Sequence, residues 1–293
     1  MGDGATGSTV PRRQLGRYLR DLRGRARLTV KAAAQALEWS EAKIWRIETG
    51  QTALRSLDAE AMCKVYGASA ELTEYLKDLA RKTKEQGWWH AYSDVIPDGF
   101  ALYYGLEESV SSMQWYHVDL IPGLFQTPEY TRVLIRNRHP DMSDEEVDRR
   151  VNFRMQRKAL LNRKTARPTF SVVLNETVLH RAVGGAHVMS RQIVHLAELS
   201  QLDTVTLRVV PFTAGMYGGL LSGPFIIMRF PDNGTREGEP PVVFIENLVG
   251  DLFLDKPTDI EQYNTVFEET WEKALNERET MRLLLQAERD LHS

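Results

Sequence analysis

Apolar residues recur every three or four positions through the first quarter of the chain, which predicts a series of short amphipathic helices. Thr29 and Ser40 stand where a side chain that caps a helix N-terminus is expected, and Gly50 stands where a left-handed residue ends a helix. The predicted helices cover residues 12–26, 30–37, 41–49, 56–67 and 71–85. The second and third are joined by only a few residues, a pattern typical of a helix-turn-helix.

Helices and strands alternate in the remaining two thirds of the chain. The predicted helices include 101–120, a long amphipathic segment over 143–161, and two closing helices near 258–275 and 277–291. Runs rich in Val, Ile and Phe predict strands at 169–175, 204–210, 223–230, 241–247 and 251–255. We therefore expect an α+β fold, in which an N-terminal all-α five-helix domain precedes a larger α+β domain.

These patterns divide the chain into four segments. Residues 1–11 are expected to be a disordered lead-in, and not a secretory signal because they contain no apolar run. The helical domain is predicted over 12–85, and Gly87 then interrupts the helical pattern. Residues 86–99 are expected to form a linker, and 100–293 the α+β domain, with a sensing or dimerising role.

Charge is distributed unevenly along the chain. Residues 1–57 contain 11 Lys and Arg against 5 Asp and Glu, whereas the rest contains 26 against 35. A basic N-terminal segment followed by an acidic body is expected when only that segment binds a polyanion.

Cys63 is the only cysteine, which excludes an intrachain disulfide and a thiolate metal cluster. No apolar run is long enough to cross a membrane, so we expect a cytoplasmic protein.

The third helix has two different faces. At 100° per residue, Ile44 and Ile47 turn inward, whereas Ala42, Arg46 and Thr49 turn outward between Lys43 and Trp45. The outward stripe is small at its centre, so the helix could approach a major groove and Arg46 could contact a guanine edge. Glu48 falls near the inner side and needs a partner there, for which Arg23 is the candidate.

The segment from "LGRYLRDLR" through "LTVKAAAQALEWSEAKIWRIETG" resembles the Cro/CI-type helix-turn-helix domain of the Xre family. The resemblance implies that Ser40 and Lys43 contact phosphate or the groove, that Thr29, Gln35 and Thr49 touch the DNA backbone, and that Glu48 pairs with Arg23. Glu38 and Trp39 occupy the turn where Gly is usual, which leaves its geometry open. The predicted DNA-binding residues are Thr29, Lys31, Gln35, Ser40, Glu41, Ala42, Lys43, Trp45, Arg46 and Thr49.

The body of the chain has a resemblance of its own. "IPGLFQTPEY", "NETVLHRAVGG", "GPFIIMRF" and "VVFIEN" resemble the C-terminal domain of actinobacterial Xre-type regulators, which include WhiJ-like proteins and Scr1-type antitoxin-like regulators. The resemblance implies a transcriptional regulator, often encoded beside a small acidic companion protein. It transfers no functional residue to the body, because the biochemistry of that domain is not established.

Motifs for other chemistry are weak. Ser222 lies among glycines without forming a G-x-S-x-G elbow, and His180, His187 and His195 form no recognised metal motif. We therefore expect no catalytic constellation, metal or cofactor.

Two segments of the body could bind a ligand or a partner. The segment IPGLFQ is either a core plug or a binding surface. A glycine-rich aromatic loop remains a candidate ligand or partner site, with Tyr217, Gly218, Gly219 and Phe225 as its residues.

The sequence predicts a sequence-specific regulator that binds palindromic double-stranded DNA as a homodimer, because twofold protein symmetry matches half-site symmetry in this class. Its body is expected to bind a small-molecule effector or the small acidic companion protein, and no membrane. The alternative is an antitoxin-like interaction module whose main role is to bind that companion.

Overall fold

A computed structural model of the chain describes residues 9–83, 88–92, 94, 96, 100–231, 239–248 and 250–292. The Cα positions group these residues into two compact units. The smaller unit contains the helices up to residue 109, and the larger contains everything from Val110 onward together with Asp94 and Ile96. Most of the expected lead-in, 1–8, and much of the expected linker, 86–99, lie outside the described residues.

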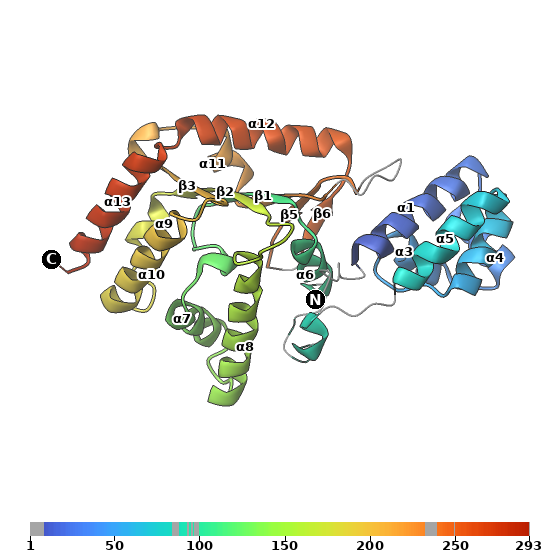
Figure 1. Cartoon of the computed structure of the whole chain (residues 1–293), viewed down its shortest axis with the longest axis horizontal. Helices are drawn as coiled ribbons and strands as arrows, with labels where there is room; N and C mark the ends of the chain where they lie inside the picture. Colours follow the sequence, from blue (N-terminus) through green and yellow to red (C-terminus); the bar gives the residue numbers. More distant parts are fainter. Residues whose placement is uncertain are drawn as a thin grey trace. The chain divides into compact units, whose positions relative to one another are not determined.

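The smaller unit is all-helical (Figure 1). Its elements are α1 (Thr9–Arg25), α2 (Val30–Leu37), α3 (Glu41–Glu48), α4 (Ser56–Tyr66), α5 (Ala70–Lys82), the 3-10 turn η1 (Trp88–Tyr92) and α6 (Phe100–Glu108). The five predicted helices are therefore confirmed, but α1 begins inside the expected lead-in. Pro11 is tolerated in its first turn, where a missing N–H costs little. Thr9 is buried because it packs against Gly105 of α6.

A single apolar core joins α1 to α5. Leu15, Leu19, Ile44, Met62 and Leu76 are among its buried members, each at most 2% exposed. Gly16 allows α1 to cross the end of α3 closely, because a Cβ on Gly16 would lie 2.6 Å from the carbonyl oxygen of Ile47. This close crossing fixes the position of α3 on the unit.

The larger unit is built on a six-stranded mixed sheet with strand order β3-β2-β1-β4-β5-β6. β1, β2 and β3 are parallel, and β4, β5 and β6 extend the sheet from β1 in antiparallel fashion. The strands are β1 (Ser112–His117), β2 (Thr169–Asn175), β3 (Val205–Val210), β4 (Phe225–Arg229), β5 (Val242–Ile245) and β6 (Leu252–Leu254). Five of them confirm the predicted strands to within a few residues. The α+β prediction is likewise confirmed.

The strand β1 corrects the sequence prediction, which continued a helix from 101 to 120. The helix α6 stops at Glu108, and Ser109 donates from its hydroxyl to the carbonyl oxygen of Gly105 at 2.9 Å. The next residues form the central strand, with Trp115 and Tyr116 buried on opposite faces. A strand that is covered on both faces lacks the alternation of polar and apolar residues that identifies a half-buried strand. The pattern of apolar positions therefore did not distinguish β1 from a helix.

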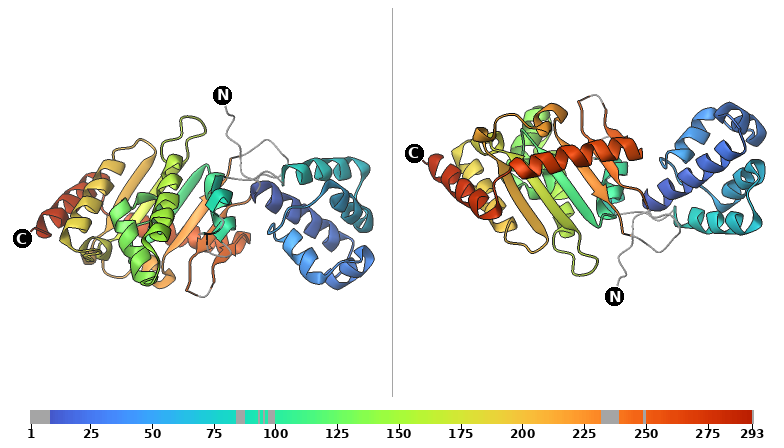
Figure 2. Two further views of the ribbon diagram at one scale, coloured as in Figure 1. Left: turned by 90° about the horizontal axis from the view of Figure 1, so that it is seen from below. Right: turned by 90° about the horizontal axis from the view of Figure 1, so that it is seen from above.

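Helices cover both faces of the sheet (Figures 1 and 2). The helix α12 runs across one face, where Ile260 and Phe267 pack with Tyr116 and Phe225. The opposite face carries α7 and α8, and α10 packs beside α13. The bounds are α7 (Pro128–Arg138), α8 (Asp144–Gln156), α9 (Thr177–His180), α10 (Ala186–Leu199), α11 (Gly218–Ser222), α12 (Pro257–Lys273) and α13 (Glu277–Asp290).

Three 3-10 turns complete the larger unit: η2 (Gly123–Phe125), η3 (Arg157–Leu160) and η4 (Phe212–Ala214). Within the described ranges, none of the helices combines the length and the apolar character that a membrane span requires.

Candidate nucleic-acid interface

The helices α2 and α3 form a capped helix-turn-helix. Thr29 Oγ1 accepts a hydrogen bond from the amide of Ala32 at 3.1 Å, and Ser40 Oγ accepts one from the amide of Lys43 at 3.2 Å. Both N-caps stand where the sequence predicted them. The hydroxyls satisfy amides at the helix starts that have no intrahelical partner. They therefore set where each helix begins.

Gly50 ends α3 in the left-handed conformation, with φ of 74°. Its amide donates to the carbonyl oxygen of Ile47 at 3.0 Å, and the amide of Gln51 donates to that of Arg46 at 2.9 Å. This pair of bonds is a Schellman motif. The expected role of Gly50 at the helix end is confirmed.

The turn between α2 and α3 uses Glu38 where a glycine is usual in the family. Glu38 has φ 56° and ψ 38°, so a side chain occupies the left-handed region. The amide of Trp39 donates to the carbonyl oxygen of Ala34 at 2.9 Å, and the Trp39 ring packs against the core. The sequence left this geometry open. The structure shows that a left-handed residue ends α2 here, as a glycine would, although Glu38 is strained in that conformation because it carries a Cβ.

The carboxylate of Glu48 turns inward, to Arg23 at the end of α1. Arg23 donates from Nε to Glu48 Oε1 at 2.7 Å, and from Nη2 to Oε2 at 2.8 Å. Its Nη1 donates to the carbonyl oxygen of Leu28 at 2.9 Å. Because Glu48 is only 5% exposed, the bidentate contact compensates a buried charge and ties α1 to α3.

The outward face of α3 is open to solvent. Glu41, Ala42, Trp45 and Arg46 are exposed on it, whereas Ile44, Ile47 and Glu48 are buried. The Arg46 side chain has no hydrogen bond or ion pair with any residue that the structure describes, so its five N–H groups are available to a ligand. Of the other residues predicted to bind DNA, the structure leaves Thr29, Lys31, Gln35 and Ser40 exposed.

Besides the N-caps Thr29 and Ser40, two more of the predicted residues have side chains engaged within the protein. The ammonium of Lys43 lies 3.3 Å from the centroid of the Trp39 ring, and Thr49 donates from Oγ1 to the carbonyl oxygen of Trp45 at 2.8 Å. Trp39 was absent from the predicted site. The sequence feature that could have identified Trp39 is its position four residues before Lys43, a spacing that allows a cation–π contact. The contact holds the Lys43 ammonium at the edge of α3.

The glycine-rich loop of the larger unit differs from its prediction as an aromatic ligand loop. Tyr217 is 8% exposed and Phe225 1%, because both pack in the core under α12. The Tyr217 hydroxyl lies 2.8 Å from that of Tyr116 and accepts from Asn175 at 2.7 Å. Gly219 is needed for close packing, because a Cβ there would lie 2.7 Å from Thr270 Oγ1 of α12 and 2.8 Å from the Tyr116 ring, whereas a Cβ on Gly218 would meet only the flexible end of the Glu269 side chain at that range. The exposed large apolar side chains of this segment are instead Phe212, Met216, Leu220 and Leu221.

The IPGLFQ segment, which includes Pro122, Gly123 and Phe125, forms part of the core. Phe125 is fully buried, and its carbonyl oxygen accepts from Gln192 at 2.7 Å. Gln126 donates to the carbonyl oxygen of Ile121 at 2.7 Å and accepts from Arg154 at 2.8 Å. These buried amides fasten the segment to α8 and α10. The plug interpretation is therefore the one that the structure supports.

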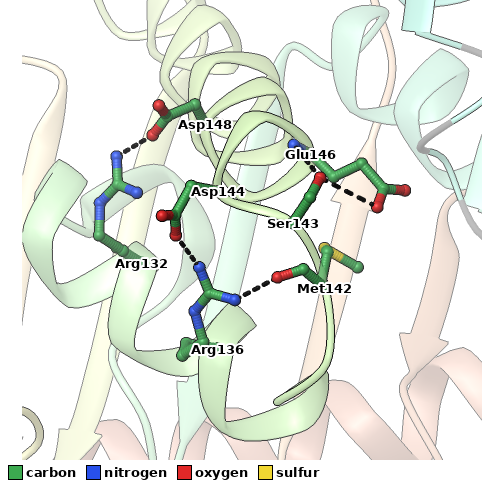
Figure 3. Close-up of polar contacts among 7 residues, drawn as sticks. All are labelled: Arg132, Arg136, Met142, Ser143, Asp144, Glu146 and Asp148. Carbon is green, nitrogen blue, oxygen red and sulfur yellow. Dashed lines mark hydrogen bonds and ion pairs between the residues drawn. The ribbon is translucent and has the colours of Figure 1, made fainter.

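A ladder of ion pairs joins α7 and α8 (Figure 3). Arg132 pairs with Asp148, and Arg136 pairs with Asp144 and with the carbonyl oxygen of Met142. A groove of about 620 Å³ lies beside these residues, but both of its arginines are matched by carboxylates. These arginines are therefore already neutralised, and neither offers unpaired positive charge to an anion.

No group of three or more His, Cys, Asp and Glu is arranged to hold a metal among the described residues. His180 lies 3.3 Å from Glu176, whereas His195 accepts from Lys158 at 3.0 Å when it is neutral. Ser222 donates to backbone carbonyls at the end of α11, and none of the described histidines pairs with it.

Comparison with known families finds two matching domains along the chain. Residues 14–76 match a helix-turn-helix domain, and residues 100–286 match a domain of unknown function, DUF5753. No curated protein and no solved structure matches the chain. The second match covers more than half of the sequence and begins with α6. The chain thus belongs to the DUF5753 family, here preceded by an N-terminal helix-turn-helix domain of the kind found in Xre-like regulators.

Proposed function

We propose that the protein is a sequence-specific transcriptional regulator that binds double-stranded DNA through α3. The observation that carries this proposal is the outward face of α3, on which Arg46 is exposed and unpaired while Glu48 is neutralised by Arg23. A helix of this kind can enter a major groove without placing that buried carboxylate against phosphate. Lys43 stands at the edge of the same face, where a phosphate contact would position the protein.

The proposal includes a homodimer that binds a palindromic operator, because twofold symmetry of the protein then matches that of the site. The DUF5753 domain would bind the signal, either a small-molecule effector or a small acidic companion protein. No catalytic step forms part of the proposal. The protein would act in the cytoplasm, at the nucleoid when it is bound to DNA.

The proposal is tested by a gel-shift titration with the upstream region of the protein's own gene. The titration is run with and without the small acidic companion protein. Arg46→Ala is expected to weaken specific binding by about 1–3 kcal/mol, because a bidentate base contact is lost. Lys43→Ala should weaken binding to all sequences similarly. Arg81→Ala provides a matched control, because Arg81 is exposed on α5 and pairs with Asp78.

The regulator interpretation fails if the wild-type protein shows no preference for this region over random DNA at physiological salt. The assignment of the outward face fails separately if Arg46→Ala leaves specific binding unchanged while the wild type retains its preference.

A further inference from the structure

A second groove lies on the larger unit, between the end of α10 and the start of α13. These two helices pack side by side (Figure 1), and Ser190 of α10 donates to Glu288 of α13 at 2.8 Å. The groove is open to solvent and has a volume of about 600 Å³, which is within the range of small-molecule sites. Its lining residues are Ser200, Gln201, Glu277, Arg278, Met281 and Arg282.

The two arginines of this groove differ from most others in the unit. Arg278 and Arg282 are exposed and have no hydrogen bond or ion pair within the described part of the chain. Five exposed arginines of the unit pair with a carboxylate: Arg132, Arg149, Arg167, Arg181 and Arg191. The partly buried Arg136 does so as well, whereas the exposed Arg138 forms no ion pair with a carboxylate among the described residues. Arg278 and Arg282 therefore belong to the smaller group of exposed arginines without such a pair, and both line one groove.

The neighbouring acids are already engaged. Glu277 lies 3.5 Å from Arg208, whose guanidinium stacks on Trp271 at 4.3 Å. Glu279 accepts from the amide of Asn276 at 3.3 Å in the capping box of α13. Neither carboxylate is therefore placed as a dedicated partner for Arg278 or Arg282, and the groove keeps an excess of positive charge.

The positions of these arginines are unfavourable for the helix itself. They are four residues apart, so their like charges lie on neighbouring turns of α13 and repel each other. Arg278 also stands in the first turn, where the helix dipole disfavours a cation. An anion held between the two guanidinium groups would relieve both effects.

The start of α13 is held firmly. The amide of Leu275 donates to the carbonyl oxygen of Val209 at 2.9 Å, and Thr280 Oγ1 accepts from the amide of Val209 at 3.1 Å. These bonds tie the backbone on either side of Arg278 to β3. The base of the arginine pair is thus fixed before a ligand binds, which lowers the entropic cost of binding.

We propose that this groove binds a small organic anion through a carboxylate or phosphate group. Arg278 and Arg282 supply the charge-assisted hydrogen bonds, the exposed amide of Gln201 supplies a neutral donor, and Met281 forms an apolar wall. The proposal concerns the DUF5753 domain alone and holds whether or not the helix-turn-helix domain binds DNA.

The test is isothermal titration calorimetry of the full-length protein with citrate and, separately, with inorganic phosphate at constant ionic strength. Saturable binding of at least one anion is expected, and the anion that binds more tightly identifies the preferred group. Arg278→Gln and Arg282→Gln should each weaken that binding roughly 10-fold or more, because each removes a charge-assisted hydrogen bond. Arg289→Gln, on the same helix outside the groove lining, serves as the matched control.

Binding at the basic helix-turn-helix domain is distinguished by Arg46→Ala, which should leave the titration unchanged. The proposal is overturned if neither anion binds saturably. It is equally overturned if the double variant Arg278→Gln/Arg282→Gln binds as the wild type does, or if Arg46→Ala abolishes the signal. None of these results bears on the DNA-binding proposal, whose failure is seen only in the gel shift.

Discussion

The buried ion pair between α1 and α3 offers the sharpest test of how the helix-turn-helix is held together. Glu48→Ala removes both acceptors of the bidentate contact and leaves the Arg23 guanidinium without its main partner. The variant is expected to unfold more easily in the smaller unit, because a charge that was compensated in a low-dielectric site becomes unpaired.

The magnitude follows from the exposure of the two side chains. Breaking a fully buried pair from one side costs about 3–5 kcal/mol. The Arg23 side chain is 15% exposed and keeps its bond to the carbonyl oxygen of Leu28, so water and the backbone compensate part of the loss. We therefore expect the low end of that range or slightly less, about 2–3 kcal/mol.

The measurement is amide hydrogen exchange across α3, since a single free energy of unfolding is not well defined for a chain of two units. The double variant Arg23→Met/Glu48→Leu is the control, because replacing both charges with apolar groups is often neutral. It should recover most of the protection that Glu48→Ala loses. A loss below about 1 kcal/mol in Glu48→Ala, or a double variant no better than the single one, would refute the assignment of a buried, stabilising pair.

Three further predictions concern single positions. Gly16→Ala should destabilise the smaller unit by about 1–3 kcal/mol, measured by amide hydrogen exchange across α1 and α3, because its Cβ would meet carbonyl oxygens at the end of α3 within 2.8 Å. Glu38→Gly should raise the melting temperature, with a gain of about 0.5–1 kcal/mol, since glycine adopts the left-handed turn without strain. Burial and the nearby Lys158 lower the pKa of His195. Below the pKa of the unfolded histidine, the unfolded chain binds more protons, so stability falls as pH drops from 7 to 5. His195→Gln should reduce this loss, as urea midpoints at the two pH values will show.

Local signals were sufficient for the helix-turn-helix. Thr29, Ser40 and Gly50 act within a few residues of themselves, through caps and a left-handed turn, and the structure places all three at helix ends. The angular positions on α3 likewise follow from its own sequence, so the inward turn of Glu48 could be predicted before its partner was seen. A helix of eight residues with one buried face leaves little else to decide.

The larger unit required the tertiary structure. The strand β1 was predicted as helix because both of its faces are covered, by α12 and by the layer of α7 and α8, and a doubly buried strand has no polar alternation. Tyr217 and Phe225 were predicted in an open loop because glycines surround them. Gly219 instead allows the chain to approach α12, which no local pattern reveals.

The sequence by itself determined the helices of the helix-turn-helix unit, the positions of five strands along the chain and the residues of the outward α3 face, because each depends on contacts between near neighbours in the chain. Only the tertiary structure decided that β1 is the central strand, that Tyr217 and Phe225 pack under α12, and that Arg278 and Arg282 line a groove together with residues that follow α10. These features depend on which distant segments meet. That is set by the sum of packing over the whole fold rather than by any one stretch of it.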